Sequence, residues 1–374
     1  MITPEPQAPA LKDQAQAVAD AVLRPDVLAM AAYTVQDASG LLKMDAMENP
    51  HRLSPQLQRQ LGTRLGALAL NRYPANGLDE LAQALTAYAA VPPNCSMVLG
   101  NGSDELIAML SIACDRPGAC VLAPTPGFVM YAVSAQLQGL RFVGVPLQND
   151  FELDEAAMLA QVARHQPSVI YLAYPNNPTA NLWDVDGMER IIAAAPGLVV
   201  IDEAYQPFAG RSFMERLGRY SNVLLMRTMS KFGLAGVRIG YLVGPHALVA
   251  QINKVRPPYN ISVLNAQCAL FALEHAEVFA QQARDIVLQR QQLFDALRTM
   301  AGVQAYRSDA NMLLVRILSA NARAADAVHQ AMKSRGVLVK NVSATDPLLH
   351  NCLRLTVGTA DENIAMLAAL KVSL

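Results

Sequence analysis

The spacing of hydrophobic residues divides the chain into regions of different predicted structure. The segment "GLDELAQALTAYAAV" places four apolar side chains three or four residues apart, as on one face of a helix. A second helix is predicted at "LSPQLQRQL", where Ser54 has the residue type of an N-cap and Pro55 suits the first helical position. A further helix is predicted near residues 11–23. A mixed segment that ends in "MDAMENP" lies between the helix near residues 11–23 and the other two.

From about residue 96 the pattern changes to short apolar runs that alternate with helical stretches. Such runs, rich in β-branched and aliphatic residues, are typical of a mostly parallel sheet that is buried on both faces. The seven runs are "SMVLG", "ACVLAP", "LRFVGVPL", "SVIYLAY", "LVVID", "NVLLM" and "RIGYLVG". We therefore expect an α/β fold with a mostly parallel seven-stranded sheet flanked by helices. Ligands bind such sheets at the carboxyl ends of the strands.

The C-terminal part predicts a smaller α/β unit. A helical zone over about 262–300 precedes three strand-like runs, "MLLVRI", "GVLVK" and "CLRLTVG", and a closing helix. We expect a large domain over residues 50–261, a small domain over residues 262–374, and an N-terminal segment, residues 1–49, that packs with the small domain.

Composition and charge narrow the class of protein. The chain has 374 residues, 52% of them hydrophobic and 16% charged, as in a globular enzyme. It carries 30 basic and 31 acidic residues, a balance that gives no support for nucleic acid or an anionic membrane as a partner. The five cysteines lack a C-x-x-C pair and the six histidines lack H-x-x-x-H spacing, so we expect no metal site. No secretory signal and no apolar run of membrane-spanning length is present, which predicts a cytoplasmic protein.

Several polar residues follow directly after predicted strands. In "VLGNGSDELIAML", Ser103 and Asp104 come after two glycines and begin a helix, an arrangement suited to binding a phosphate. An ordinary strand–turn–helix with a serine N-cap is the alternative. In "YPNNPTAN", the Asn177 amide could donate to an anionic oxygen, and a Pro–Asn turn is the alternative.

An acidic residue ends another buried strand. Asp202 ends the apolar run in "LVVIDEAYQPF", where a carboxylate is costly unless it has a cationic partner. Tyr205 lies three residues further and is near enough to serve the same pocket. A helix-capping role for Asp202 is the alternative.

The segment "RTMSKFGLAGVRIGY" places Lys231 after an apolar strand and before a glycine-containing turn. Thr228 and Ser230 offer hydroxyls, and Arg238 offers a guanidinium, all of which can bind a phosphate. A lysine is usually a solvated surface charge, but the flanking strand and turn weaken that alternative.

Taken together, these motifs resemble the fold type I pyridoxal-phosphate-dependent aminotransferases over almost the whole chain. Within that superfamily they look like the histidinol-phosphate aminotransferases. The motifs are "MDAMENP", "NRYPANGLDEL", "GNGSDELI", "YPNNPT", "DEAY", "SKFGLAGVRIGY" and "NCLRLTVGT".

The resemblance implies pyridoxal 5'-phosphate as the cofactor, bound by the large domain, and a role for each residue. Lys231 would hold the cofactor aldehyde as an imine and later move the proton. Asp202 would keep the ring nitrogen protonated, while Tyr205 and Asn177 would donate to the phenolic oxygen. Phe128, in "TPGFVMY", would stack on the ring, although the family often has tyrosine there. The phosphate would be held by Ser103, Asp104, Thr228, Ser230 and Arg238.

The resemblance also implies a homodimer and a substrate site. Tyr73 would reach the cofactor phosphate of the neighbouring subunit. Arg354 would bind an anionic group of the substrate, Asn177 would contribute to the same site, and Tyr33 would lie over it. Many relatives have arginine where Lys340 stands, and Lys340 is expected to face the same anion as Arg354; a solvated lysine at the end of a strand is the alternative.

The implied reaction is transamination of L-histidinol phosphate with 2-oxoglutarate, in two ping-pong half-reactions through the Lys231 imine, as a step of histidine biosynthesis. The alternatives of similar chemistry are an aromatic amino-acid aminotransferase and a phosphoamino-acid decarboxylase. A non-catalytic regulator is disfavoured because Lys231 and Asp202 are both present. A nicotinamide oxidoreductase is disfavoured because there is no G-x-G-x-x-G turn.

Overall fold

A computed structural model describes residues 11–32, 34, 36–74, 77–321 and 323–374. The chain divides into two compact units, Met1–Ser39 and Gly40–Leu374. The first unit contains α1 (Leu11–Val22) and α2 (Pro25–Ala29), and neither helix has a buried residue. The helix predicted near residues 11–23 is confirmed.

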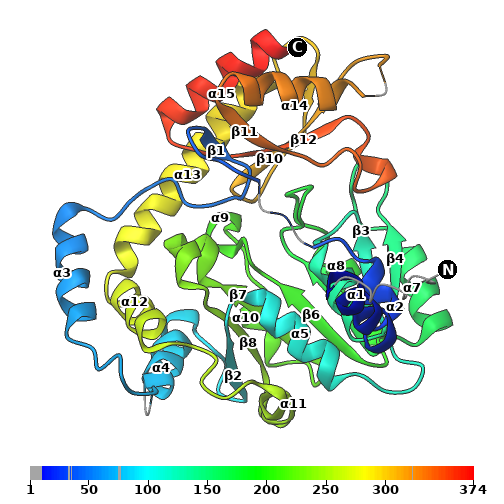
Figure 1. Cartoon of the computed structure of the whole chain (residues 1–374), viewed down its shortest axis with the longest axis vertical. Coiled ribbons are helices and arrows are strands. Elements are labelled where there is room, and N and C mark those ends of the chain that lie inside the picture. Colours follow the sequence, from blue (N-terminus) through cyan, green and yellow to red (C-terminus); the bar gives the residue numbers. More distant parts are fainter. Residues whose placement is uncertain (1–10, 33, 35, 75–76, 322) are drawn as a thin grey trace, which may run out of the picture. The chain divides into compact units, whose positions relative to one another are not determined.

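The second unit contains a seven-stranded sheet whose strand order is β2-β8-β7-β6-β5-β3-β4 (Figure 1). The strands are β2 (Cys95–Gly100), β3 (Cys120–Thr125), β4 (Arg141–Pro146), β5 (Val169–Ala173), β6 (Leu198–Asp202), β7 (Val223–Thr228) and β8 (Gly240–Pro245). All neighbouring pairs are parallel except those that β8 makes with β2 and β7. The predicted mostly parallel seven-stranded sheet is therefore confirmed, with one antiparallel strand inside it.

Successive residues of the central strands pack into different cores, which explains their continuous apolar runs. Tyr171 and Val200 belong to a core shared with three helices, α5 (Ser103–Ala113), α6 (Met130–Leu137) and α11 (His246–Ile252). Ile170 and Ile201 belong to a core shared with five others, α4 (Gly77–Ala89), α7 (Glu155–His165), α8 (Val185–Ala194), α10 (Met214–Leu217) and α12 (Val263–Glu274). Since both faces of the sheet are covered, both sets of side chains are mainly apolar, and the charged residues of the site lie where the strands end.

A five-stranded sheet forms the second layer of this unit, in the order β1-β11-β12-β10-β9. Its strands are β1 (Leu42–Met44), β9 (Val303–Ala305), β10 (Met312–Ile317), β11 (Val337–Asn341) and β12 (Cys352–Thr356). β1 is parallel to β11, and the other pairs are antiparallel. The N-terminal strand β1 thus completes a sheet built from the C-terminal part of the chain.

Helices connect and cover the two sheets, and Figure 1 shows α13 extending from α12 to the five-stranded sheet. The helical elements are α3 (Pro55–Gly66), α4 (Gly77–Ala89), α5 (Ser103–Ala113), α6 (Met130–Leu137), α7 (Glu155–His165), α8 (Val185–Ala194), α9 (Gln206–Ala209), α10 (Met214–Leu217), η1 (Ser230–Leu234), η2 (Ala235–Val237), α11 (His246–Ile252), η3 (Asn253–Val255), α12 (Val263–Glu274), α13 (Ala276–Leu297), α14 (Ala324–Ser334), η4 (Pro347–Leu349) and α15 (Ala360–Ser373). The helical zone predicted over 262–300 is two helices, separated at His275.

The predicted start of α3 is also present. Pro55 is its first residue, and the Ser54 side chain accepts a hydrogen bond of 3.3 Å from the Leu57 amide. This side chain satisfies one of the backbone donors that a helix start leaves without a partner. Among the described residues, none of the helices has the length and apolar composition needed to cross a membrane.

Candidate active site

The carboxyl ends of the central parallel strands surround a cavity of about 350 Å³. β5 is followed by Asn177, β6 ends at Asp202, and β7 ends at Thr228 and is followed by Lys231. The cavity brings together ten of the residues singled out in the sequence: Ser103, Asp104, Phe128, Asn177, Asp202, Tyr205, Thr228, Ser230, Lys231 and Arg238.

Lys231 lies on η1, directly after β7. Its Nζ donates a hydrogen bond of 2.9 Å to the Ala46 carbonyl and lies 5.8 Å from the centre of the Tyr205 ring. Burial lowers the pKa of Lys231 to about 7, and the positive charge of Arg354 contributes to the same shift. Near neutral pH a large share of this amine is therefore uncharged and able to act as a nucleophile or a base.

Asp202 is the buried acidic residue of the cavity lining, with 5% of its surface exposed; Asp104 and Glu48 also line the cavity. Its Oδ2 accepts a hydrogen bond of 2.6 Å from the Tyr131 hydroxyl, and its Oδ1 accepts one of 3.0 Å from the Ala204 amide. Burial raises the pKa of Asp202 to about 6, although these two hydrogen bonds act against the rise. The carboxyl is thus mostly ionised at neutral pH and faces a cavity that could receive a cationic group.

Arg354 joins the two sheets beside this cavity. It lies on β12, and its guanidinium donates a hydrogen bond of 2.7 Å to the Asn177 side-chain oxygen and one of 2.8 Å to the Asp45 carbonyl. Because the Asn177 oxygen is occupied in this way, its amide N–H groups remain to donate into the cavity. Burial raises the pKa of Tyr205, so its hydroxyl is also a donor.

The start of α5 forms one end of the cavity and is suited to an anion. Gly102, with φ of 80°, is the N-cap of α5 and precedes the first helical turn, whose amides have no acceptor within the helix itself. The Arg238 guanidinium donates to Asp104 Oδ2 at 3.1 Å and to Ser230 Oγ at 3.5 Å. Ser230 Oγ in turn accepts a 3.0 Å hydrogen bond from the Thr228 hydroxyl. Hydroxyl, amide and guanidinium donors therefore converge at this end.

Two glycines permit this close packing. A Cβ at Gly102 would lie 2.7 Å from Arg238 Nη2. A Cβ at Gly240 would lie 2.8 Å from the Ser103 backbone nitrogen. Real Cβ contacts are not this short, so side chains at either position would move α5 or Arg238 away from the anion-binding end.

A buried ion pair fixes the strand ends from the opposite face of the sheet. Glu203 accepts hydrogen bonds of 3.0 and 2.8 Å from the Arg227 guanidinium and one of 3.0 Å from the Ser212 hydroxyl. The Phe213 amide donates to the same carboxylate. Arg227 directly precedes Thr228, and Glu203 directly follows Asp202. The ion pair therefore ties the end of β7 to the end of β6.

Of the four remaining predicted residues, three are described by the structure and do not line the cavity. Tyr73 is 75% exposed and its ring stacks on that of Tyr259, with the ring centres 4.4 Å apart. Tyr33 lies outside the described residues. Arg354 and Lys340 are absent from the lining, although Arg354 contacts Asn177, which belongs to it.

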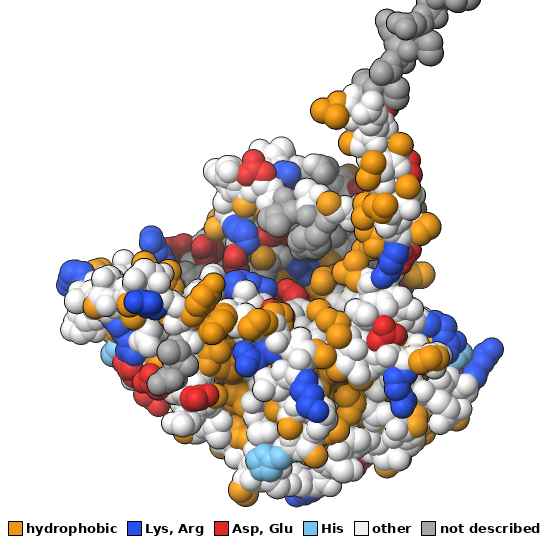
Figure 2. Space-filling model, turned by 60° about the horizontal axis from the view of Figure 1, so that its bottom comes forward, with side chains coloured by type: hydrophobic (Ala, Val, Ile, Leu, Met, Phe, Trp, Pro, Cys, Tyr) orange, Lys and Arg blue, Asp and Glu red, His pale blue; other side chains and the backbone are white. Residues whose placement is uncertain are grey.

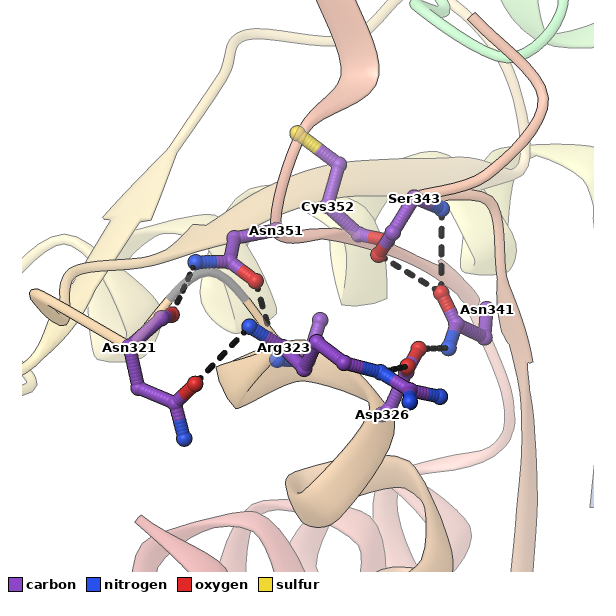
Figure 3. Close-up of polar contacts among 8 residues, drawn as sticks. Asn321, Arg323, Asp326, Asn341, Ser343, Asn351 and Cys352 are labelled. Atoms are coloured by element: carbon purple, nitrogen blue, oxygen red, sulfur yellow. Dashed lines mark hydrogen bonds and ion pairs between the residues drawn. The ribbon is translucent and has the colours of Figure 1, made fainter. Parts of the chain in front are cut away.

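Lys340 lies beside Arg354 in the five-stranded sheet. The two residues are paired across β11 and β12, so their side chains leave the same face of the sheet. A polar network holds the end of β11 in place: Asn341 donates to Asp326 at 2.7 Å and accepts from the Ser343 hydroxyl at 2.7 Å (Figure 3). This network fixes the backbone next to Lys340.

The sequence reasoning missed two parts of the cavity. One is Tyr131, which contacts Asp202 and lies three residues after Phe128 in the quoted "TPGFVMY". The other is the segment of Ala46, Met47 and Glu48, from the quoted motif "MDAMENP". The available signal for Tyr131 was a second aromatic residue in the same short motif, three positions after Phe128.

Comparison with known proteins identifies the family. The sequence profile described as aminotransferase class I and II matches residues 42–370. The chain belongs to the class I and II aminotransferases. It is 64% identical to a histidinol-phosphate aminotransferase of Polaromonas naphthalenivorans, covering 94% of this chain and 96% of the relative. It is 62% identical to one of Methylibium petroleiphilum, covering 93% and 94%. The predicted resemblance is thus confirmed.

The fold of this aminotransferase is similar to that of solved structures. A histidinol-phosphate aminotransferase from Sinorhizobium meliloti, in complex with pyridoxal-5'-phosphate, matches with a TM-score of 0.83 at 24% identity. The match covers 94% of this chain and 97% of that one.

The shifted pKa of Lys231 leads to a measurable prediction for this aminotransferase. We expect its amine to lose its proton near pH 7, because burial penalises the charged form. After hydroxylamine removes any bound aldehyde, lysines can be labelled by reductive ¹³C-methylation and titrated by NMR. The resonance absent from Lys231→Ala should have a midpoint near pH 7.

Replacing Arg354 with methionine should raise that midpoint, since the positive charge of Arg354 is the second cause of the shift. If Lys231 of the wild-type protein titrated close to the ordinary lysine value of 10.5, the amine would not be desolvated and the prediction would be contradicted.

Proposed function

We propose that this protein is a pyridoxal-phosphate-dependent aminotransferase that converts L-histidinol phosphate and 2-oxoglutarate to imidazole acetol phosphate and L-glutamate. The observation that carries this proposal is the desolvated amine of Lys231 in one cavity with the buried carboxyl of Asp202. The identity of 64% to a histidinol-phosphate aminotransferase supports this substrate over the aromatic amino acids and over decarboxylation.

The residues of the cavity fit pyridoxal 5'-phosphate. Its phosphate would be held by Ser103, Ser230 and Arg238, together with Thr228 and the amide of Asp104, where donors converge at the start of α5. Asp202 would pair with the ring nitrogen, and Phe128 would lie against the ring. When bound, this cofactor accepts the electron pair that the substrate carbon releases.

Lys231, Tyr205 and Asn177 would act at the other end of the ring. Lys231 would attach the aldehyde and, once released, carry the proton, which requires a neutral amine at working pH. The Tyr205 hydroxyl and the Asn177 amide would donate to the phenolic oxygen. The hydrogen bond from Arg354 to the Asn177 oxygen supports this amide orientation.

Substrate anions would bind beside Asn177. Arg354 can form two parallel hydrogen bonds with carboxylate or phosphate, and its contact with Asn177 brings it to the cavity edge. Lys340 is its cross-strand neighbour and would supply a second positive charge. Tyr33 remains a predicted contact of the substrate.

We further propose that the protein forms a two-fold homodimer in which Tyr73 reaches the partner's cofactor phosphate. Tyr73 and Tyr259 expose 75% and 56% of their surface while their rings stack, and Leu70 is 61% exposed. Figure 2 shows hydrophobic side chains exposed among Lys and Arg side chains on one face of the molecule. Exposed aromatic pairs of this kind are typical of protein interfaces.

The division into residues 50–261, residues 262–374 and an N-terminal segment of residues 1–49 remains a prediction, as does a cytoplasmic location. Pairing of β1 with β11 supports an association between residues 42–44 and the small domain.

Removing the Lys231 amine should abolish catalysis. Lys231→Ala should lower kcat by several orders of magnitude, because both the attachment point and the proton carrier are lost. The control is Lys254→Ala, since Lys254 is an exposed lysine that contacts Gln251. The measurement is a coupled assay with histidinol phosphate, glutamate and phenylalanine. Near-normal turnover by Lys231→Ala, or a wild-type preference for phenylalanine, would contradict the proposal.

Substitutions at the anion site should have different effects on the two substrates. Arg354→Ala should weaken both half-reactions by roughly 2–4 kcal/mol of transition-state binding, because it removes a paired charge. Lys340→Ala should raise KM for histidinol phosphate more than KM for glutamate, because a phosphate dianion carries more charge. Steady-state kinetics for each half-reaction test this. Equal effects of Lys340→Ala on the two substrates would remove the phosphate role of Lys340.

Shared active sites predict complementation between two inactive forms. A heterodimer of Lys231→Ala and Tyr73→Ala contains one native site, so random mixing should recover up to about a quarter of wild-type activity. The control mixes Lys231→Ala with Asp202→Asn, whose two sites both lack a residue of the same cavity. Activity no greater than the sum of the separate variants would contradict a shared site.

A further inference from the structure

Tyr131 makes the shortest described contact to the carboxyl of Asp202. Its hydroxyl lies 2.6 Å from Oδ2, while the Ala204 amide lies 3.0 Å from Oδ1. Each oxygen of the carboxylate therefore has a donor from the chain itself. Tyr131 comes from α6 and Asp202 from β6, so this hydrogen bond joins a helix to the end of a strand 71 residues away in the sequence.

An aromatic stack holds Tyr131 in place. Its ring is nearly parallel to that of Tyr171, with an interplanar angle of 6° and 4.3 Å between ring centres. Phe128 meets the Tyr131 ring edge-on, at 84° and 5.6 Å. Tyr131 and Tyr171 are 2% and 1% exposed. The Tyr131 hydroxyl can therefore turn away from Asp202 only if packed rings move.

The two hydroxyls of this stack differ in one respect. The Tyr131 hydroxyl donates to Asp202, whereas the Tyr171 hydroxyl is buried and has no hydrogen-bond partner among the described residues. The same ring type thus occurs twice at nearly the same depth, once with and once without a contact to the carboxylate.

The charge on Asp202 depends on this contact. Burial raises the pKa of Asp202, and the hydrogen bond from Tyr131 is the first of the effects that oppose the rise. Burial also raises the pKa of Tyr131 well above its usual range, so its hydroxyl keeps its proton and remains the donor. The other titratable groups that influence Asp202 or are influenced by it are Asp104, Glu203, Tyr171 and Tyr205.

We propose that Tyr131 is a positioning residue for the proposed reaction: its hydroxyl orients the Asp202 carboxylate and keeps it ionised, so that the carboxylate can hold a proton on the ring nitrogen of the cofactor. A hydrogen bond to the ionised form stabilises that form over the protonated one. Without it, a buried carboxyl takes the proton more readily, and the ring nitrogen loses its charge. This role rests on the proposed function, but the state of Asp202 can be measured without catalysis.

The first experiment follows the Asp202 carboxyl in the full-length protein without cofactor. Aspartate is labelled with ¹³C at its carboxyl carbon, and Asp202→Asn assigns the resonance. Tyr131→Phe should raise the titration midpoint of Asp202 by about one pH unit, the size expected for a hydrogen bond to a charged group. The control Tyr171→Phe removes the neighbouring hydroxyl and should leave the midpoint unchanged.

A second replacement protects the test if Tyr131→Phe folds poorly. 3-Fluorotyrosine at position 131 keeps the ring and the hydroxyl but makes the hydroxyl more acidic. It should lower the Asp202 midpoint, the opposite direction from Tyr131→Phe. A structural role for the ring alone predicts no such shift.

The second experiment uses the enzyme with its cofactor. Tyr131→Phe should lower kcat about tenfold while KM for glutamate changes less than about twofold, and Tyr171→Phe should change neither value by more than about twofold. If the Asp202 midpoint does not move in Tyr131→Phe, or moves equally in Tyr171→Phe, the proposal is overturned. Failure of the proposed function would be seen separately. The wild-type protein would then show no transamination, while Tyr131→Phe would still raise the titration midpoint of Asp202.

Discussion

Desolvation of one amine organises this site. Lys231 sits where β7 ends, between packed strands and the segment of Ala46 and Met47, and its pKa falls to about 7 because burial weakens the solvation of its charge. A lysine on the surface would remain protonated at neutral pH and could neither attack a carbonyl nor accept a proton. The sheet, the glycine-containing turn and the segment over the cavity are therefore all conditions for the chemistry of this side chain.

Burial has the opposite effect on the acidic side of the cavity, where the protein has to keep a charge rather than remove one. Asp202 is held by Tyr131 and Ala204, while its neighbour Glu203 pairs with Arg227 on the other face of the sheet. Two consecutive carboxylates are thus stabilised by different means: Asp202 by hydrogen bonds from a hydroxyl and an amide, with no cationic partner among the described residues, and Glu203 by an ion pair. The first arrangement leaves Asp202 available to a cation from the cavity.

The sequence predicted the sheet and many cavity residues because the relevant signals are local. A strand buried on both faces is a continuous apolar run, and Asp202 and Lys231 are conspicuous because each directly follows such a run. Tyr131 could not be assigned in the same way, since its partner is 71 residues away and a buried tyrosine resembles any core aromatic residue. The exposed position of Tyr73 could not be found from the chain pattern either, because it depends on packing around Tyr259.

The different surroundings of Asp202 and Glu203 have an evolutionary consequence for this pair. Asp202 lines the cavity, whereas Glu203, the first residue after β6, pairs with Arg227, so neither carboxylate replaces the other when one is lost by mutation. A carboxylate is present at both positions, yet there is no redundancy between them. The cavity constrains residue 202 and the Arg227 guanidinium constrains residue 203, so selection should maintain a carboxylate at each of these neighbouring codons for a different reason.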